Sequence, residues 1–318
     1  MCANNALMCG TCESDRSFHM AHASSGNGAP VIPGHFHRLG LAARPADNYA
    51  TWLSDVLGAV RIESGMRQVH GIPFGGSGNT DGISQESGAV SEMIWLGTTP
   101  ICIFAAVDDV GQLGAFVAKY GSGLHSVAWT VQDIWKTETL LRRSEIRITG
   151  VDLPGRHFFM HPADTAGMLI EITDTEFTND PRDNPEVVLP VNEGSVVQGA
   201  QMGWLTMAVA DPVKSAQILS AVVEASVVTG LPRNPGDELI DLRINDVIIR
   251  LLKRDAADTS RDTLHSWCIS VPDLADTCIR LTSAGIRVDS QTELLATTHQ
   301  EDTLGMRLQW VQAASLVS

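Results

Sequence analysis

Basic residues and long apolar runs are scarce in this chain, and each scarcity excludes a class of protein. Its 318 residues include 22 Lys and Arg against 37 Asp and Glu, so the formal charge is −15. Because a nucleic-acid surface needs a basic face, we expect no nucleic-acid partner. No apolar run reaches the ~18 residues that cross a bilayer, and the first residues lack a secretory signal. We therefore expect a soluble, cytoplasmic protein without a membrane partner.

Cysteines and aromatic residues are also few. The six cysteines stand at positions 2, 9, 12, 102, 268 and 278. In a chain of this length they do not make a disulfide scaffold, which favours a reducing compartment. Cys9 and Cys12 form a C-x-x-C pair, but it lies in a polar leader without the second pair that a zinc site needs. We interpret residues 1–33 as an irregular extension. Aromatic residues make up 5% of the chain and indicate no particular ligand class.

Hydrophobic residues make up 44% of the chain, enough for a large core and about two domains. Apolar periodicity predicts helices over 46–57, 133–146, 212–224 and 274–284, with a shorter one around Phe116. It predicts strands over 35–42, 90–96, 100–107, 123–129, 203–209, 238–244, 247–252, 264–269 and 305–310. The glycine-rich segment 65–88 is longer than ordinary connections, so we expect a lid over a cleft.

The predicted elements repeat along the chain. Leu-His-Ser stands at 124–126 and again at 264–266, and Gly-Met precedes both Glu171 and Gln309 at the same distance. Two such coincidences favour internal duplication into four units. We expect a first domain over 34–176, a proline-containing linker over 177–199 and a second domain over 200–318.

One carboxylate, Glu171, stands on an otherwise apolar predicted strand and requires a partner if it is buried. The segments around it are GLHSVAW at 123–129, FMHP at 159–162 and GMLIEI at 167–172. Together they resemble the methylmalonyl-CoA epimerases of the vicinal-oxygen-chelate superfamily, which also contains glyoxalases, bleomycin-resistance proteins and extradiol dioxygenases. The resemblance covers roughly residues 35–174. It implies an α+β fold of four βαβββ modules paired into two vicinal-oxygen-chelate domains.

The resemblance also implies a metal site in the first domain. His37 matches the family's first histidine ligand and Glu171 its terminal glutamate, whereas Cys102 and Ser126 replace the other two ligands. With Cys102 as thiolate, the three groups would give zinc an open position; manganese and iron are the alternatives, and no organic cofactor is expected. His70 would add a nitrogen if its loop folds inward. The alternatives are a core histidine at His37, perhaps bonded to Glu171, and an inert buried thiol at Cys102.

The family chemistry draws a proton from a carbon beside a carbonyl, which needs a base and an electrophile. His70, Glu92 and His37 are candidate bases, although strand parity turns Glu92 away from the cleft. Ser126 would orient a metal-bound water.

Four residues of the first half are candidate substrate contacts. They are Trp95 and Trp129, together with Arg156 and His161, which have strand-end structural roles as the alternative.

The second half offers no good ligand set, since Trp204, Arg250, Ser266 and Gln309 stand at the corresponding positions. We expect an isomerase or lyase that acts through an enolate-type intermediate on a carbonyl-bearing small molecule. The alternatives are a non-catalytic small-molecule-binding protein and an extradiol-type dioxygenase. Four modules can form both clefts in one chain, so a monomer suffices and a homodimer stays open.

Overall fold

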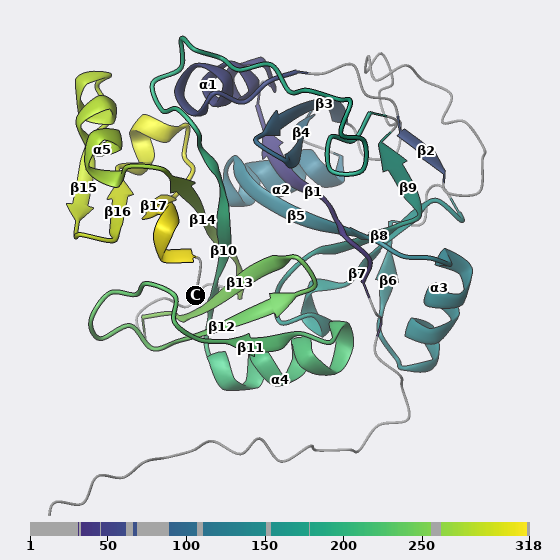
Figure 1. The fold of residues 1–318 in the computed structure, drawn as a ribbon. Coiled ribbons are helices and arrows are strands. Elements are labelled where there is room, and N and C mark those ends of the chain that lie inside the picture. The colour runs from purple at the N-terminus through teal and green to yellow at the C-terminus, as the bar shows by residue number, and fades with distance from the viewer. Residues whose placement is uncertain are drawn as a thin grey trace, which may run out of the picture.

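The computed structural model describes residue 31 and residues 33–44, 46–61, 66–68, 89–106, 111–150, 154–177, 179–255 and 262–316. Most of the predicted extension 1–33 and of the predicted lid 65–88, including His70, lies outside these residues. Within the described residues the fold is α+β, with two large mixed sheets and five α-helices, as Figure 1 shows. None of the described helices is long and apolar enough to cross a membrane.

The first sheet joins two modules through their first strands. Its order is β3 (Ala89–Leu96), β4 (Thr99–Ala106), β1 (Phe36–Ala43), β5 (Gly123–Thr130), β8 (Ile170–Thr173), β7 (His157–Met160) and β6 (Ile148–Thr149). β1 and β5 pair antiparallel, while each module's first strand runs parallel to its last, β1 to β4 and β5 to β8. A short separate pair, β2 (Met66–Gln68) with β9 (Thr175–Phe177), lies beside it.

The second sheet repeats this plan with eight strands. Its order is β11 (Ser226–Val228), β12 (Leu239–Ile244), β13 (Val247–Lys253), β10 (Gln201–Val209), β14 (Thr263–Val271), β17 (Leu308–Gln312), β16 (Leu295–Thr298) and β15 (Val288–Gln291). Here β10 and β14 pair antiparallel, and β10/β13 and β14/β17 are the parallel pairs. The predicted arrangement of four βαβββ modules in two pairs is confirmed.

The helices also agree with the periodicity. They are α1 (Ala46–Leu57), α2 (Gln112–Tyr120), α3 (Ile134–Arg143), α4 (Pro212–Val223) and α5 (Leu274–Ser283), with 3-10 helices η1 (Pro162–Asp164), η2 (Gln300–Thr303) and η3 (Ala313–Leu316). An aspartate caps each of α3, α4 and α5: Asp133, Asp211 and Asp273 accept from the backbone amide three residues later. This bond satisfies one of the free amides of the first turn.

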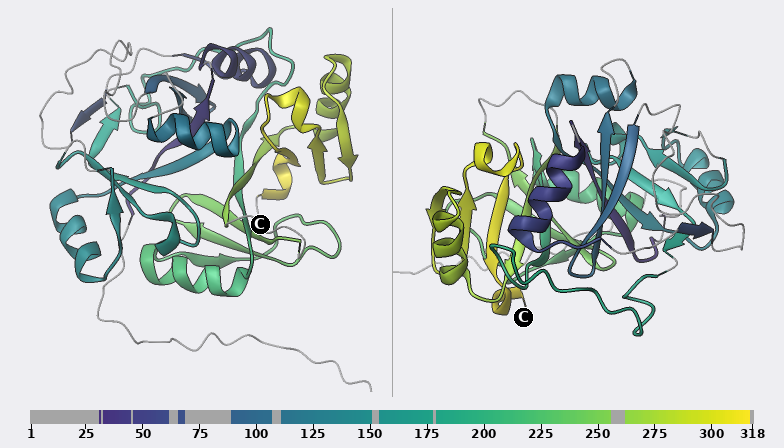
Figure 2. Two further views of the ribbon diagram at one scale, coloured as in Figure 1. Left: turned by 180° about the vertical axis from the view of Figure 1, so that it is seen from behind. Right: turned by 90° about the horizontal axis from the view of Figure 1, so that it is seen from above.

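A connected apolar core joins the module helices to one side of each sheet. Leu39, Leu41, Ile101 and Ile103 contribute from the first sheet. The core continues into the second half, where Tyr49 of α1 donates a hydrogen bond to the Leu304 carbonyl at 2.7 Å. The right panel of Figure 2 shows α1 beside the C-terminal strands. The two halves therefore pack against each other along a seam.

The other side of the first sheet is polar at its centre, and we call it the first polar face. It carries Arg38, Cys102, Ser126 and Glu171. α2 packs against one end of this face, where Leu113 and Val117 contact Ala42. The equivalent side of the second sheet, with Thr206, Arg250, Ser266 and Gln309, is the second polar face.

Both first strands carry the same irregularities. β1 shifts register between Phe36 and Arg38 and again after Gly40, and β10 shifts between Met202 and Trp204 and again after Thr206. Such bulges turn side chains out of strict alternation. Because they recur at matching places, the two halves share more than their order of elements.

The connection between the halves is packed rather than loose. Val196 and Val197 donate backbone hydrogen bonds to Asp55 and Val56 of α1, and the Asn192 amide donates to the Ser54 carbonyl. We keep 34–176 and 200–318 as proposed domains and 177–199 as the proposed linker, although β9 crosses the limit at 176.

Candidate functional site

Glu171 is buried, and its partner is Arg38. The Arg38 Nη2 atom lies 2.5 Å from Glu171 Oε1, and the two side chains are 10% and 2% exposed. In register, Arg38 stands opposite Ala128, and Ala128 stands beside Glu171. The guanidinium therefore reaches across the small Ala128 side chain to the carboxylate two strands away.

His37 lies on the other side of the same guanidinium. Its Nδ1 atom is 2.6 Å from Arg38 Nη1, its Nε2 is 3.4 Å from Thr175 Oγ1, and its ring stacks on Phe177 with centroids 4.4 Å apart. Arginine only donates, so Nδ1 must accept and the proton sits on Nε2. Burial, and then the neighbouring Arg38 charge, lower the pKa of His37 well below its usual 6.5. His37 is therefore neutral at neutral pH.

Cys102 and Ser126 form the next row of the face. Gly40 pairs with both, and a Cβ atom at Gly40 would collide with the Ser126 hydroxyl. Burial raises the pKa of Cys102 to about 12, so it is a thiol at neutral pH. β5 bulges at His125, between Leu124 and Ser126, and the His125 ring contacts Phe104 and Phe116.

These residues do not fit a divalent metal. A metal ligand must present a free lone pair and, for cysteine, a thiolate. His37 and Glu171 are engaged by the Arg38 cation, and Cys102 is a buried thiol that would have to release its proton to bind a metal. Among the described residues, His37, Cys102 and Glu171 do not bring their ligand atoms within 4.8 Å of one another. A guanidinium stands where the resemblance implies a metal ion.

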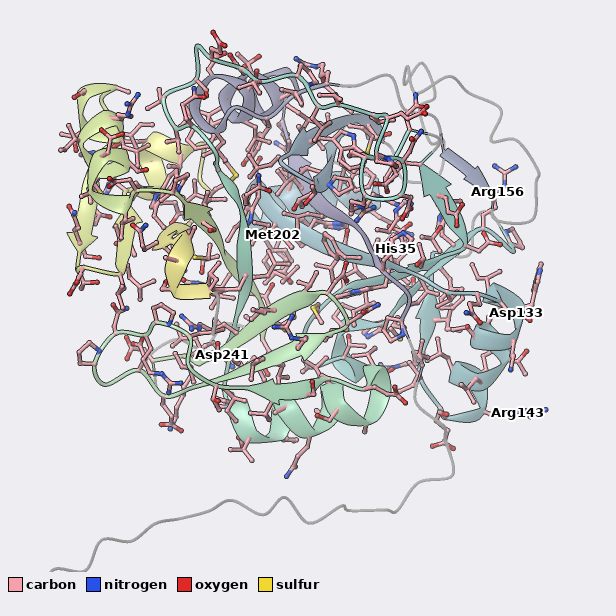
Figure 3. The ribbon with its side chains drawn as sticks, in the orientation of Figure 1. His35, Asp133, Arg143, Arg156, Met202 and Asp241 are labelled. Atoms are coloured by element: carbon pink, nitrogen blue, oxygen red, sulfur yellow. The ribbon has the colours of Figure 1, made fainter. Side chains whose placement is uncertain are left out.

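A different group does gather in this way: His35, Asp180 and Asp183 have ligand atoms within 4.8 Å of one another. Figure 3 labels His35, which immediately precedes β1. Asp180 is already ion-paired, with Arg182 Nη2 at 2.5 Å. The same guanidinium also donates to the Phe36 carbonyl. This group is a candidate metal centre in which an internal cation competes for one of three ligands.

The two tryptophans predicted to contact substrate lie on opposite sides of the sheet. Trp95 is on β3 near the first polar face, where its ring contacts Phe177 and Arg182. Trp129 packs edge-on against Phe36 in the core and is fully buried. Because Trp129 lies with the helices, it is left out of the proposed site.

Arg156 and His161 take strand-end positions. The Arg156 carbonyl accepts hydrogen bonds from the Asp174 amide and the Thr173 hydroxyl, and Figure 3 shows Arg156 at the periphery of the molecule. His161 caps η1 by accepting from the Ala163 amide at 3.2 Å. Glu92, a candidate base, pairs with Arg61 at 2.5 Å.

The second polar face also holds a buried arginine. Arg250 pairs with Asp241 at 2.7 Å, with side chains 3% and 0% exposed, and lies over the Trp204 ring at 4.2 Å. Register places Arg250, Ser266 and Gln309 at the positions of the second sheet that correspond to Cys102, Ser126 and Glu171 in the first, as expected. Trp204, however, corresponds to Arg38. Arg38 pairs with Ala128, the neighbour of Glu171, and Trp204 pairs with Cys268, the neighbour of Gln309. The expected match of Trp204 with His37 is wrong by one residue, because Arg38 and Trp204 each stand two residues before the equivalent positions Gly40 and Thr206.

Sequence reasoning missed Arg38 as a site residue. The signal was present, since Arg38 stands in the apolar strand FHRLGLAA as Glu171 stands in its own. A buried cation needs a partner as much as a buried anion does, so the two charges predict each other.

Similarity to solved structures, and not to known sequences, relates this fold to known proteins. No protein-family model matches the chain, and no curated protein sequence matches it significantly. A mutant of 4-hydroxymandelate synthase from Streptomyces coelicolor is similar over 88% of this chain and 92% of its own, with 10% identity and a TM-score of 0.59. Methylmalonyl-CoA epimerase from Mycobacterium tuberculosis is similar over 49% of this chain and 92% of its own, with 22% identity and a TM-score of 0.35.

The first of these likenesses spans both halves and is a likeness of fold. 4-Hydroxymandelate synthase is a vicinal-oxygen-chelate protein, and the paired sheets have the predicted module order. The protein therefore has the fold of the vicinal-oxygen-chelate superfamily, with four modules in two pairs.

Proposed function

We propose that the chain binds a small carbonyl-bearing molecule on the first polar face without a metal. Arg38 would donate a hydrogen bond to the carbonyl oxygen, and Ser126 would add a second polar contact. The observation that carries the proposal is the Arg38 guanidinium, held between the His37 imidazole and the Glu171 carboxylate. A fixed cation supplies the attraction for oxygen that a metal ion would otherwise supply.

The charge balance favours a neutral carbonyl over a carboxylate. Glu171 neutralises Arg38, so little net charge is left to attract an anion. The contacts with His37 and Glu171 use two of the five N–H donors of the guanidinium. Arg38 is also more exposed than Glu171, 10% against 2%, so a ligand from the solvent side meets the donor first.

Binding is favoured over catalysis because the described bases are engaged. Both His37 ring nitrogens have neighbours within hydrogen-bonding reach, and its lowered pKa makes it a weak base. Glu92 pairs with Arg61. The dioxygenase alternative needs a metal that this donor set does not fit.

An enolate-type isomerase or lyase is the second candidate. It is favoured by one contact, the neutral His37 ring beside the Arg38 cation. In such an enzyme the Nδ1 atom of His37 would take the proton after Arg38 turns from it to hold the enolate oxygen. His70, also predicted as a base, lies outside the described residues.

The test uses ethyl pyruvate, a neutral 2-oxo ester, in the presence of EDTA, with ethyl lactate as the reduced comparison. We expect ethyl pyruvate to bind more tightly than ethyl lactate. The double variant Arg38→Met with Glu171→Gln removes both charges of the face and should weaken binding by about tenfold or more. The matched control is Arg250→Met with Asp241→Asn, which removes the corresponding pair from the second polar face and should leave binding unchanged.

Loss of binding on adding EDTA, or equal losses in both double variants, would contradict metal-free binding at Arg38. The same probe separates binding from catalysis, because its methyl protons adjoin a carbonyl. Exchange of these protons with D2O that is faster than in buffer, and that is lost in His37→Gln, would favour the isomerase or lyase. Binding without such exchange favours the binding protein.

A further inference from the structure

The seam between the two halves contains a cavity of about 350 Å³. One wall comes from Phe116 and Tyr120 of α2 and from residues 121–124 at the start of β5. The facing wall comes from residues 263–265 at the start of β14 and from 305–307 before β17. Its volume is within the range of small-molecule sites. Neither Arg38 nor Glu171 lines it, so it is separate from the first polar face.

The cavity differs in charge from the rest of the chain. None of its described lining residues is an Asp or Glu, although the chain carries a formal charge of −15. The charged lining residue is Arg307, which two neighbours hold in place. Its Nε donates to Gln300 Oε1 at 3.0 Å, and its Nη1 contacts His265 Nε2. A positioned guanidinium loses little freedom when it binds a carboxylate in the bidentate geometry it favours.

Apolar side chains form part of the remaining lining, and there is space beside the strand. Phe116, Leu264 and Met306 contribute apolar surface, and Tyr120 is 45% exposed. A Cβ atom at Gly121 or Gly123 would meet nothing within 4 Å. A flat ring fits such a wall better than a small inorganic anion does, because it buries apolar area as well as charge.

We infer that this seam cavity binds a small aromatic carboxylate, with Arg307 holding the carboxylate and the α2 side of the cavity holding the ring. The site depends on both halves, since α2 and β5 belong to the first and β14 and β17 to the second. The inference is independent of the function proposed for the first polar face.

The test is a titration of the full chain with benzoate, in which binding is measured by NMR of the ligand. The neutral isostere benzamide is titrated in parallel. Benzoate should bind more tightly than benzamide, and Arg307→Gln should weaken benzoate binding by about tenfold or more. Arg280→Gln is the matched control, because Arg280 is an exposed arginine of α5 paired with Asp276 outside the cavity. It should leave benzoate binding unchanged.

A second variant tests the ring contact. Tyr120→Ala should weaken benzoate binding while leaving the unfolding temperature of the free protein close to that of the wild type, since the side chain is half exposed. Equal affinity for benzoate and benzamide would overturn the inference. An unchanged benzoate affinity in Arg307→Gln, or equal losses in Arg307→Gln and Arg280→Gln, would overturn it as well.

Discussion

Replacing Glu171 by Gln leaves the Arg38 guanidinium buried without a counter-charge. Breaking a buried ion pair from one side typically costs about 3–5 kcal/mol of folding free energy. We expect a loss of that size in urea unfolding. Adding Arg38→Met should recover part of the loss, because no unpaired charge then remains.

Glu138→Gln is the control for this prediction, since it breaks the exposed Arg142–Glu138 pair on α3. Exposed pairs contribute about 0–1 kcal/mol. Equal costs for Glu138→Gln and Glu171→Gln would show that the Arg38–Glu171 pair is not buried as described.

The buried His37 should make stability fall in mild acid. Its folded-state pKa lies well below 6.5, the value expected in the unfolded chain, so the unfolded chain binds the proton more readily. The contribution of neutral His37 to the free energy of unfolding is complete above about pH 6.5. It is lost as the pH falls from there toward the folded pKa, by up to about 1.4 kcal/mol per pH unit. Urea unfolding between pH 5 and 7 measures it, and His37→Asn should flatten the slope; an unchanged slope would assign it to other groups.

At the scale of elements, modules two and four share a turn that the sequence pattern only partly revealed. Gly-Met was recognised as a repeat, but the full motif reads H-x-x-D-T-x-G-M at 161–168 and 299–306. In each copy the threonine hydroxyl donates to the methionine carbonyl at 2.5 Å, from Thr165 to Met168 and from Thr303 to Met306. The aspartates pair with Arg147 and Arg287 in the same geometry.

Both threonines are fully buried, so removing either hydroxyl leaves a buried carbonyl without that donor. Thr165→Val and Thr303→Val should each cost about 1–3 kcal/mol in urea unfolding. Thr282→Val, which removes an exposed hydroxyl bonded to the Cys278 carbonyl within α5, should cost less. A cost in only one of the two turns would mean that the copies do not contribute equally to stability.

Element limits followed from the sequence closely. The helix expected over 46–57 is α1, and the Gly58 that ends it has a φ of +73°, as a helix-ending glycine requires. Strand register was less predictable, because bulges depend on cross-strand contacts rather than on the strand's own pattern. The register shift between Phe36 and Arg38 recurs between Met202 and Trp204, and neither strand's own apolar pattern predicts it.

For the whole molecule, the sequence predicted four paired modules because repeated motifs and apolar periodicity can be read directly from the chain. It placed Glu171 at the centre of the first face for a sound reason, the cost of a buried charge. It did not predict the arginine partner, since position-by-position matching to the family favoured a metal ion. The two polar faces prove alike in holding a buried arginine–carboxylate pair, Arg38–Glu171 and Arg250–Asp241.

Restoring the family's ligand at Ser126 should not by itself create a metal site. Ser126→His alone adds a nitrogen, but Arg38 still engages His37 and Glu171. Ser126→His combined with Arg38→Ala removes that competition and should bind Co²⁺, with tetrahedral or octahedral absorption as the readout. Tight Co²⁺ binding by Ser126→His alone would show that the guanidinium does not block the ligands.

Manganese titration of the wild-type chain, beside Glu171→Gln and Asp183→Asn, tests most directly whether Arg38 stands in place of a metal. The structure predicts that no Mn²⁺ binding depends on Glu171. Any binding that is observed should persist in Glu171→Gln and disappear in Asp183→Asn, which would assign it to the group of His35, Asp180 and Asp183. Stoichiometric binding in the wild type that Glu171→Gln abolishes and Asp183→Asn leaves intact would contradict the account.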